Sequence, residues 1–167
     1  MRMSMSTEPD LAARLTRLED LEAIRALDAR YCRHLDDGNW DDLMTLFTDD
    51  GEFDGLSNPR GRTEMRAFFA GLADGGLTSF WHFITNLEIE IDGGDTAVAR
   101  SFLWQPCVLD GVASIAAGRY TDELVKQDGR WLYRVKRVRF HFFGPLADGW
   151  DENRFALDSA RAAAVNP

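Results

Sequence analysis

The chain has 167 residues, of which 45% are hydrophobic and 28% are charged, and its formal net charge is −9 at pH 7. This length suits a single domain with its own core, which we place at residues 10–150. The negative charge opposes contact with nucleic-acid phosphates and with anionic membrane surfaces, so we expect neither as a partner. The two cysteines, Cys32 and Cys107, have no metal-binding or disulfide spacing. The N-terminus is polar and no apolar run approaches the ~20 residues that span a bilayer, which indicates a cytoplasmic protein.

The N-terminal part of the sequence has the periodicity of helices. Residues 1–9 are predicted to form a flexible leader. Between 11 and 35, apolar residues recur every three or four positions, which predicts an amphipathic helix of about six or seven turns. A short helix at 40–47, a short strand that starts at 52–54 and a third helix at 63–72 follow, separated by segments rich in Asp and Gly.

The second half of the sequence changes to strand patterns. Four strands are predicted at 80–91, 96–109, 112–126 and 130–143, joined by short turns. Strands of this length form a curved antiparallel meander. Three helices followed by such a meander predict an α+β fold, in which the sheet curves over the long helix and encloses an apolar pocket suited to a small molecule. Residues 151–167 are predicted to form a C-terminal tail.

Among the three histidines, His82 stands in an apolar segment between Trp81 and Phe83. Neighbouring rings favour the neutral imidazole, which suits a general base near pH 7. A core histidine that is hydrogen-bonded to the backbone is the alternative. By strict alternation His82 lies on the opposite face of its strand from Leu87 and Ile89. A bulge is therefore required between them if one face lines the pocket throughout.

Asp36 closes the long helix directly after the apolar-face residue Leu35. A carboxylate beside an imidazole fixes the tautomer and stabilises the imidazolium, although an Asp that only forms the turn is the alternative. Tyr31 lies five residues earlier on the same helix, so its hydroxyl points toward the same space or belongs to the core. Arg139 is one of four cations within residues 134–139 of the last strand. An inward Arg there would hold a carboxylate or a developing oxyanion, whereas most of these cations are expected at the surface.

The sequence carries no motif for a nucleotide or a nucleophile. P-loop, G-x-G-x-x-G, G-x-S-x-G, H-E-x-x-H and C-x-x-C patterns are all absent. We therefore expect no cofactor. A metal site made of His34, Asp36 and His82 would use a known ligand set, but the spacing is not diagnostic, so no metal is expected either.

Six short stretches resemble the SnoaL-like branch of the nuclear-transport-factor-2-like superfamily, and their order and spacing carry the similarity over residues 11–149. The stretches are 22–25, 30–43, 46–51, 81–86, 118–123 and 128–131. The resemblance implies a cone-shaped α+β fold, with N-terminal helices packed on a curved, mainly antiparallel sheet around a pocket. The chain is most similar to the bile acid 7α-dehydratases, the scytalone dehydratases and the hexachlorocyclohexane dehydrochlorinases. Gln105, Cys107 and Tyr120 differ from the matching residues of these lyases, which implies a different pocket wall and substrate.

These lyases eliminate HX from a carbon skeleton without a cofactor, using a histidine assisted by an aspartate, and His82 and Asp36 occupy those two positions. Tyr31 and Arg139 match a tyrosine and an arginine of the bile acid enzymes. The resemblance thus implies a dehydratase-like lyase for a hydrophobic cyclic small molecule. Other members of the superfamily leave open a ketosteroid-isomerase-like isomerase, a polyketide cyclase, and a non-catalytic ligand-binding or dioxygenase small-subunit-like scaffold. A homo-oligomer is also implied, with a trimer preferred over a dimer.

Overall fold

The structure is a computed structural model that describes residues 8–149. The predicted tail at 151–167 lies outside the described residues, as do residues 1–7 of the predicted leader, whereas Glu8 already belongs to the first helix. The elements in chain order are α1 Glu8–Asp36, α2 Trp40–Met44, β1 Phe47–Asp54, α3 Gly61–Ala70, β2 Leu77–Phe80, β3 Phe83–Asp92, β4 Thr96–Leu109, β5 Val112–Gln127, β6 Arg130–Pro145 and the short 3-10 helix η1 Leu146–Asp148. No helix in this part of the chain is long and apolar enough to span a membrane.

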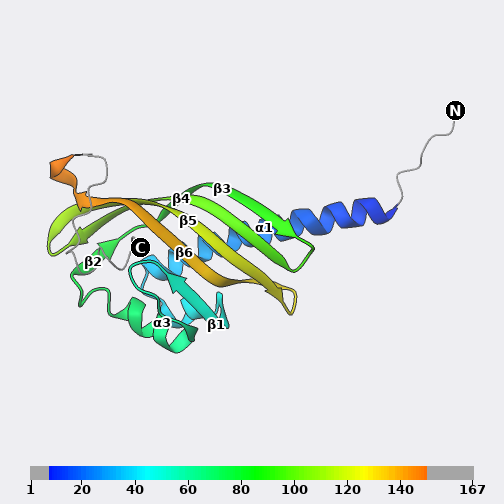
Figure 1. Cartoon of the computed structure of the whole chain (residues 1–167), viewed down its shortest axis with the longest axis horizontal. Helices are drawn as coiled ribbons and strands as arrows, with labels where there is room; N and C mark the ends of the chain where they lie inside the picture. Colours follow the sequence, from blue (N-terminus) through cyan, green and yellow to red (C-terminus); the bar gives the residue numbers. More distant parts are fainter. Residues whose placement is uncertain (1–7, 150–167) are drawn as a thin grey trace.

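Six strands form one curved sheet in the order β1-β6-β5-β4-β2, with β3 also paired to β4. The paired strands are antiparallel except β1 and β6, which are parallel. The sheet curls around the C-terminal half of α1, and α3 and β1 lie together at one side of it (Figure 1). This arrangement confirms the predicted α+β cone. The predicted four-stranded meander was incomplete, because β1 is longer than the predicted start of a strand and the strand predicted at 80–91, which is β3, is preceded by the separate strand β2.

The two halves of α1 have different surroundings. The buried apolar side chains of α1 are Ile24, Leu27, Tyr31 and Leu35. In contrast, Leu11, Leu15 and Leu18 are 68%, 55% and 63% exposed, although the same periodicity predicted a continuous buried stripe. The physical reason is visible in Figure 1, where the first turns of α1 extend past the edge of the sheet. Only the C-terminal half of the helix therefore packs under the sheet and can supply residues to its interior.

The strand β3 contains the bulge that the alternation of the sequence required. Its register with β4 shifts between Thr85 and Glu88, and Asn86 adopts a positive φ of 54°. β3 has one residue more than β4 across this shift, so the faces of the strand exchange at this point. As a result, Leu87 and Ile89 pack against the core.

Candidate active site

Asp36 and His82 form a hydrogen-bonded pair where the end of α1 meets the sheet. Oδ1 of Asp36 lies 2.6 Å from Nδ1 of His82. The backbone N–H of His82 donates to Oδ2 of Asp36 at 2.9 Å. One carboxylate therefore holds both the ring and the backbone of the histidine. The side chains of His82 and Asp36 are 7% and 14% exposed, so water has little access to the pair.

Two local features of the chain position this pair. α1 ends because Gly38 adopts a φ of 70°, a left-handed conformation that glycine favours. The N–H of Asn39 then donates to the carbonyl of His34 at 2.8 Å, which completes the helix C-terminus and leaves the Asp36 side chain beside the sheet. His82 lies between β2 and β3, where its N–H is not used by a strand ladder and binds the carboxylate instead.

The geometry selects one tautomer of the neutral imidazole. An ionised carboxylate only accepts hydrogen bonds, so Nδ1 of His82 carries the proton and Nε2 is left as the acceptor. The rings of Phe80 and Tyr31 approach the imidazole edge-on, with centroid distances of 5.5 Å and 6.5 Å. Such an imidazole can take a proton through Nε2 while Asp36 compensates the charge that develops on the ring.

A small space, which we term the inner chamber, lies beside His82. Its volume is about 30 Å³, and its lining is mainly Leu, Phe and Tyr, with Gln105 as an uncharged polar group. Tyr31 and Tyr120 also line it. Burial raises the pKa of both phenols well above the ordinary value, so they stay protonated and can donate hydrogen bonds. The structure thus brings Tyr31 to the same chamber as His82.

A buried lysine, Lys136, lies against the rings of Tyr31 and Tyr120. Nζ of Lys136, whose side chain is fully buried, donates to Oδ2 of Asp122 at 2.7 Å and to Oδ1 of Asp28 at 3.0 Å. It also lies 4.5 Å and 4.1 Å from the ring centroids of Tyr31 and Tyr120. Burial alone would lower the pKa of Lys136, but the two carboxylates raise it above the usual value. We term these five residues the lysine cluster.

The structure does not bring Arg139 to this site. Val138 and Phe140 line the inner chamber, whereas the Arg139 side chain between them lies on the outer face of β6 and is 36% exposed. Its guanidinium donates to both carboxylate oxygens of Asp54 at 2.9 Å. The prediction that Arg139 faces the substrate is therefore corrected: Arg139 is an ion-pair partner of Asp54 on the outside of the cone.

Sequence reasoning missed Lys136, because most cations of this strand were expected at the surface. The period-two alternation of Lys136, Val138 and Phe140 was the available signal, since residues two apart share one face of a strand. Gln105 carries the same signal on β4, where it lies two residues from the buried Leu103. Inward-facing polar residues on these strands can therefore be recognised from their apolar neighbours at spacing two.

The described residues provide no metal-binding cluster and no reactive thiol in addition to the Asp36–His82 pair. Within residues 8–149, no group of three or more His, Cys, Asp or Glu side chains is arranged to hold a metal ion. Cys32 and Cys107 are free thiols. Burial raises the pKa of Cys32 to about 12 and that of Cys107 to about 11, so neither is a reactive thiolate near neutral pH.

Comparisons with known proteins agree with this architecture. No curated protein matches the sequence significantly. A hexachlorocyclohexane dehydrochlorinase from Novosphingobium barchaimii LL02 is 23% identical, with a TM-score of 0.74, over 87% of this chain and 99% of that chain. A proposed scytalone dehydratase from Novosphingobium aromaticivorans DSM 12444 is 22% identical, with a TM-score of 0.71, over 86% and 98% of the two chains.

A third structure, an NTF2-like protein with a cystatin-like fold from Novosphingobium aromaticivorans, is 28% identical with a TM-score of 0.64, over 97% of this chain and 99% of that chain. The first two likenesses, at below 25% identity, concern the fold alone. The family model of the SnoaL-like domain matches residues 16–138, which is most of the chain. The chain therefore belongs to the SnoaL-like family, whose members share the nuclear-transport-factor-2-like cone.

Proposed function

We propose that this protein is a cofactor-independent lyase that removes water from a hydrophobic cyclic molecule. The observation that carries the proposal is the 2.6 Å contact between Asp36 and His82 beside an apolar chamber. A purely structural scaffold needs no such pair, so the contact favours catalysis over a non-catalytic role. The names of the two fold neighbours, a dehydrochlorinase and a dehydratase, denote eliminations and support the same class of reaction.

The proposed reaction starts with proton abstraction from carbon. Nε2 of His82 takes a proton from a carbon next to a carbonyl or a conjugated system, and the electron pair of that C–H bond moves toward the carbonyl oxygen. Asp36 compensates the charge of the resulting imidazolium. The protonated phenol of Tyr31 donates a hydrogen bond to the oxygen that gains charge. That electron pair then returns to form a carbon–carbon double bond as the carbon–oxygen bond to the leaving hydroxyl breaks, and the imidazolium gives its proton to that oxygen, which departs as water.

Variants of the pair test this proposal directly. The parent protein is incubated with a panel of apolar cyclic β-hydroxy ketones, and mass spectrometry detects products that have lost one water. His82→Ala and Asp36→Asn should each lower turnover by about a hundredfold or more, since an acid–base group contributes roughly 10²–10⁴-fold. The matched control His141→Ala replaces an exposed histidine of β6 and should turn over at the parent rate. Near-parent turnover in both pair variants would reject the mechanism.

The same base also suits an isomerisation or a cyclisation, because each begins with removal of a proton from carbon. Product mass separates the reactions. A product that is lighter by one water indicates elimination, whereas a product of unchanged mass that still requires His82 indicates an isomerase. The Asp36–His82 pair serves both, so this measurement and not the geometry decides between them.

We further propose that the chain assembles as a homo-oligomer, with a trimer preferred, through the outer face of the sheet. Phe83 and Phe102 on this face are 55% and 44% exposed. Phe83 pairs directly with Trp104, which is also 44% exposed. Adjacent exposed rings are typical of contacts between proteins. Light scattering should therefore give a multiple of the chain mass at micromolar concentration, and Phe83→Ser should lower it. A monomeric parent protein would contradict the proposal.

A further inference from the structure

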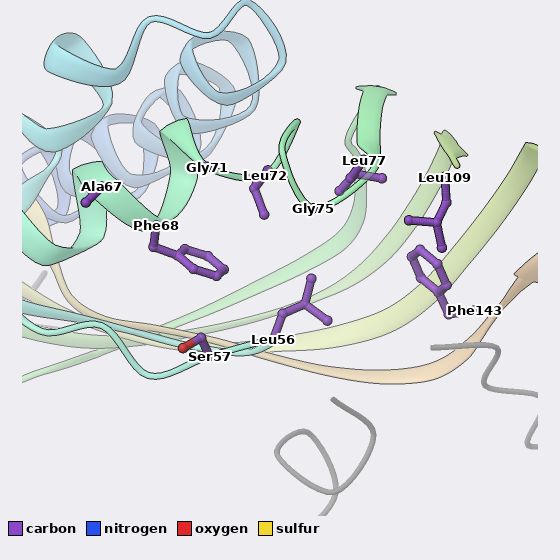
Figure 2. Close-up of a pocket in the computed structure, with 10 residues that line it drawn as sticks. All are labelled: Leu56, Ser57, Ala67, Phe68, Gly71, Leu72, Gly75, Leu77, Leu109 and Phe143. Atoms are coloured by element: carbon purple, nitrogen blue, oxygen red, sulfur yellow. The ribbon is translucent and has the colours of Figure 1, made fainter. Parts of the chain in front are cut away.

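A second hollow adjoins the inner chamber. It has a volume of about 390 Å³ and lies between α3, the segment after β1 and the ends of β4 and β6. Figure 2 shows Phe68 and Leu72 on one side of it, Leu56 opposite them, and Leu109 beside Phe143 at its far end. Ser57 is its only polar side chain among the described residues, and no charged side chain lines it. We term this space the outer hollow.

The two spaces share one wall. Leu56, Phe68, Leu72 and Leu77 line both the inner chamber and the outer hollow. The inner chamber, at about 30 Å³, has room for little more than a water molecule, since a water needs roughly 10–15 Å³. Small-molecule sites typically offer about 300–1,000 Å³, and the outer hollow lies within that range. A substrate that reacts at His82 must therefore leave most of its volume outside the inner chamber.

We propose that the outer hollow is the binding site for the uncharged, apolar part of the substrate, whose polar reacting end passes between the shared wall residues to His82. This inference rests on the proposed elimination and adds a substrate class to it: a neutral molecule with one oxygenated end and a hydrocarbon portion. The polar groups His82, Tyr31 and Gln105 stand at the inner end only. A substrate with a charge on the portion that lies in the outer hollow should bind weakly, because an unpaired charge in an apolar site is costly.

Two other hollows reach the pair, one of which has a volume of about 350 Å³ and is lined by His82 itself beside the charged Arg25 and Asp28. The second, of about 270 Å³, is lined by Asp36 and by polar residues that include Thr78. Five residues line both that hollow and the inner chamber: Leu35, Phe69, Leu72, Leu77 and Phe80. Both competing hollows carry charged side chains, whereas the described residues that line the outer hollow include none, so the apolar portion of a substrate favours the outer hollow.

Binding of N-phenyl-1-naphthylamine, an uncharged fluorescent hydrophobe, tests the assignment. Ala67→Trp and Ser57→Trp each place an indole at the outer hollow, from two different sides and at exposed positions that tolerate a large residue. Both should weaken binding of the probe by about tenfold or more, since each builds a clash against the ligand. The matched control Thr78→Trp fills one of the competing hollows from an exposed position of β2 and should bind the probe like the parent. Parent-like binding in both outer-hollow variants, or loss of binding in the control, would overturn the proposal.

A chemical modification experiment tests whether a ligand in the outer hollow covers the route to His82. Diethylpyrocarbonate acylates neutral imidazoles, and peptide mass spectrometry follows His82 and the exposed His141 in the same sample. Saturating probe should slow the acylation of His82 by about fivefold or more, because it covers the route, and should leave His141 unaffected. Equal reaction of His82 with and without probe would overturn the route.

The experiments distinguish a failure of the elimination mechanism from a failure of the outer hollow as the substrate site. His82→Ala should keep the affinity for the probe within about twofold, because the probe needs only the apolar hollow. If turnover survives in His82→Ala while Ala67→Trp loses the probe, the elimination mechanism is wrong and the binding site stands. If turnover depends on His82 but Ala67→Trp and Ser57→Trp bind and react like the parent, the outer hollow is not the substrate site.

Discussion

The lysine cluster offers a sharp test of how this fold tolerates charge in its core. Replacing Lys136 by Met keeps a side chain of similar length but removes the cation. Asp122 and Asp28, whose side chains are 1% and 8% exposed, then face each other without a positive partner. Oδ2 of Asp28 already lacks a hydrogen-bond partner among residues 8–149. The variant therefore leaves two poorly hydrated carboxylates without a cation. Within the described chain only the Tyr133 hydroxyl on Asp28 and the Arg137 backbone N–H on Asp122 remain as donors, which is more damaging than the loss of the lysine contacts themselves.

The expected magnitude follows from that burial. Breaking a buried ion pair by removing one partner costs about 3–5 kcal/mol, a large part of the roughly 5–15 kcal/mol that stabilises a typical domain. Urea unfolding followed by circular dichroism measures the loss. With a slope near 2 kcal/mol per molar urea, as is typical for small proteins, the midpoint of Lys136→Met should fall by about 1.5–2.5 M.

Two further variants separate charge from packing. Arg134→Met on the same strand removes an exposed cation that pairs with Glu123, and it should cost less than about 1 kcal/mol. Adding Asp122→Asn to Lys136→Met removes one of the orphaned charges, and the Asn side-chain oxygen can still accept the backbone N–H of Arg137 that Asp122 now binds. The double variant should recover at least about 1 kcal/mol. A loss below about 1 kcal/mol in Lys136→Met, or no recovery in the double variant, would refute the reasoning.

Three other predictions follow from single contacts. Burial raises the pKa of Asp122 from 3.8 to about 6, so the folded state binds a proton that the unfolded state has released. The unfolding free energy of the parent minus that of Asp122→Asn, measured in urea at several pH values, should therefore fall as pH rises from 3.8 to about 6. A Cβ on Gly118 would meet the Arg139 carbonyl oxygen at 2.5 Å, whereas one on Gly71 would lie 3.3 Å from the Ala67 carbonyl oxygen. In thermal melts Gly118→Ala should lose more stability than Gly71→Ala, by about 1–3 kcal/mol, and equal melting would contradict the close approach. Although burial opposes it, arginines that include Arg139 hold the pKa of Asp54 below its usual value, so this carboxylate contributes stability that is lost as pH falls through its folded-state pKa. Arg139→Met should therefore lose less stability than the parent on acidification, and an unchanged acid profile would refute this role.

The fold was largely predictable because its periodicities are local. The helix spacing at 11–35 and the alternation along the later strands both follow from side chains that face one core. The alternation even required the bulge that the structure shows at Asn86. Two features were not predictable in this way. The parallel pairing of β1 with β6 joins segments that are distant in the sequence, and the exposure of Leu11 depends on where the sheet ends and not on the helix itself.

The candidate site shows which part of a polar arrangement a sequence can reveal. The alternation of side chains along a strand predicts the face on which each residue lies. It therefore places Lys136 and Arg139 on opposite faces of the last strand from the sequence alone. It does not state which residues compensate an inward charge. Lys136 is tolerable in the core only because Asp28 arrives from α1 and Asp122 from β5, and no local pattern relates these three positions. The pairing of Asp36 with His82, which are 46 residues apart, has the same character. Because burial makes each of these charges costly on its own, an inward charged residue in such a strand is evidence that its partner exists elsewhere in the chain.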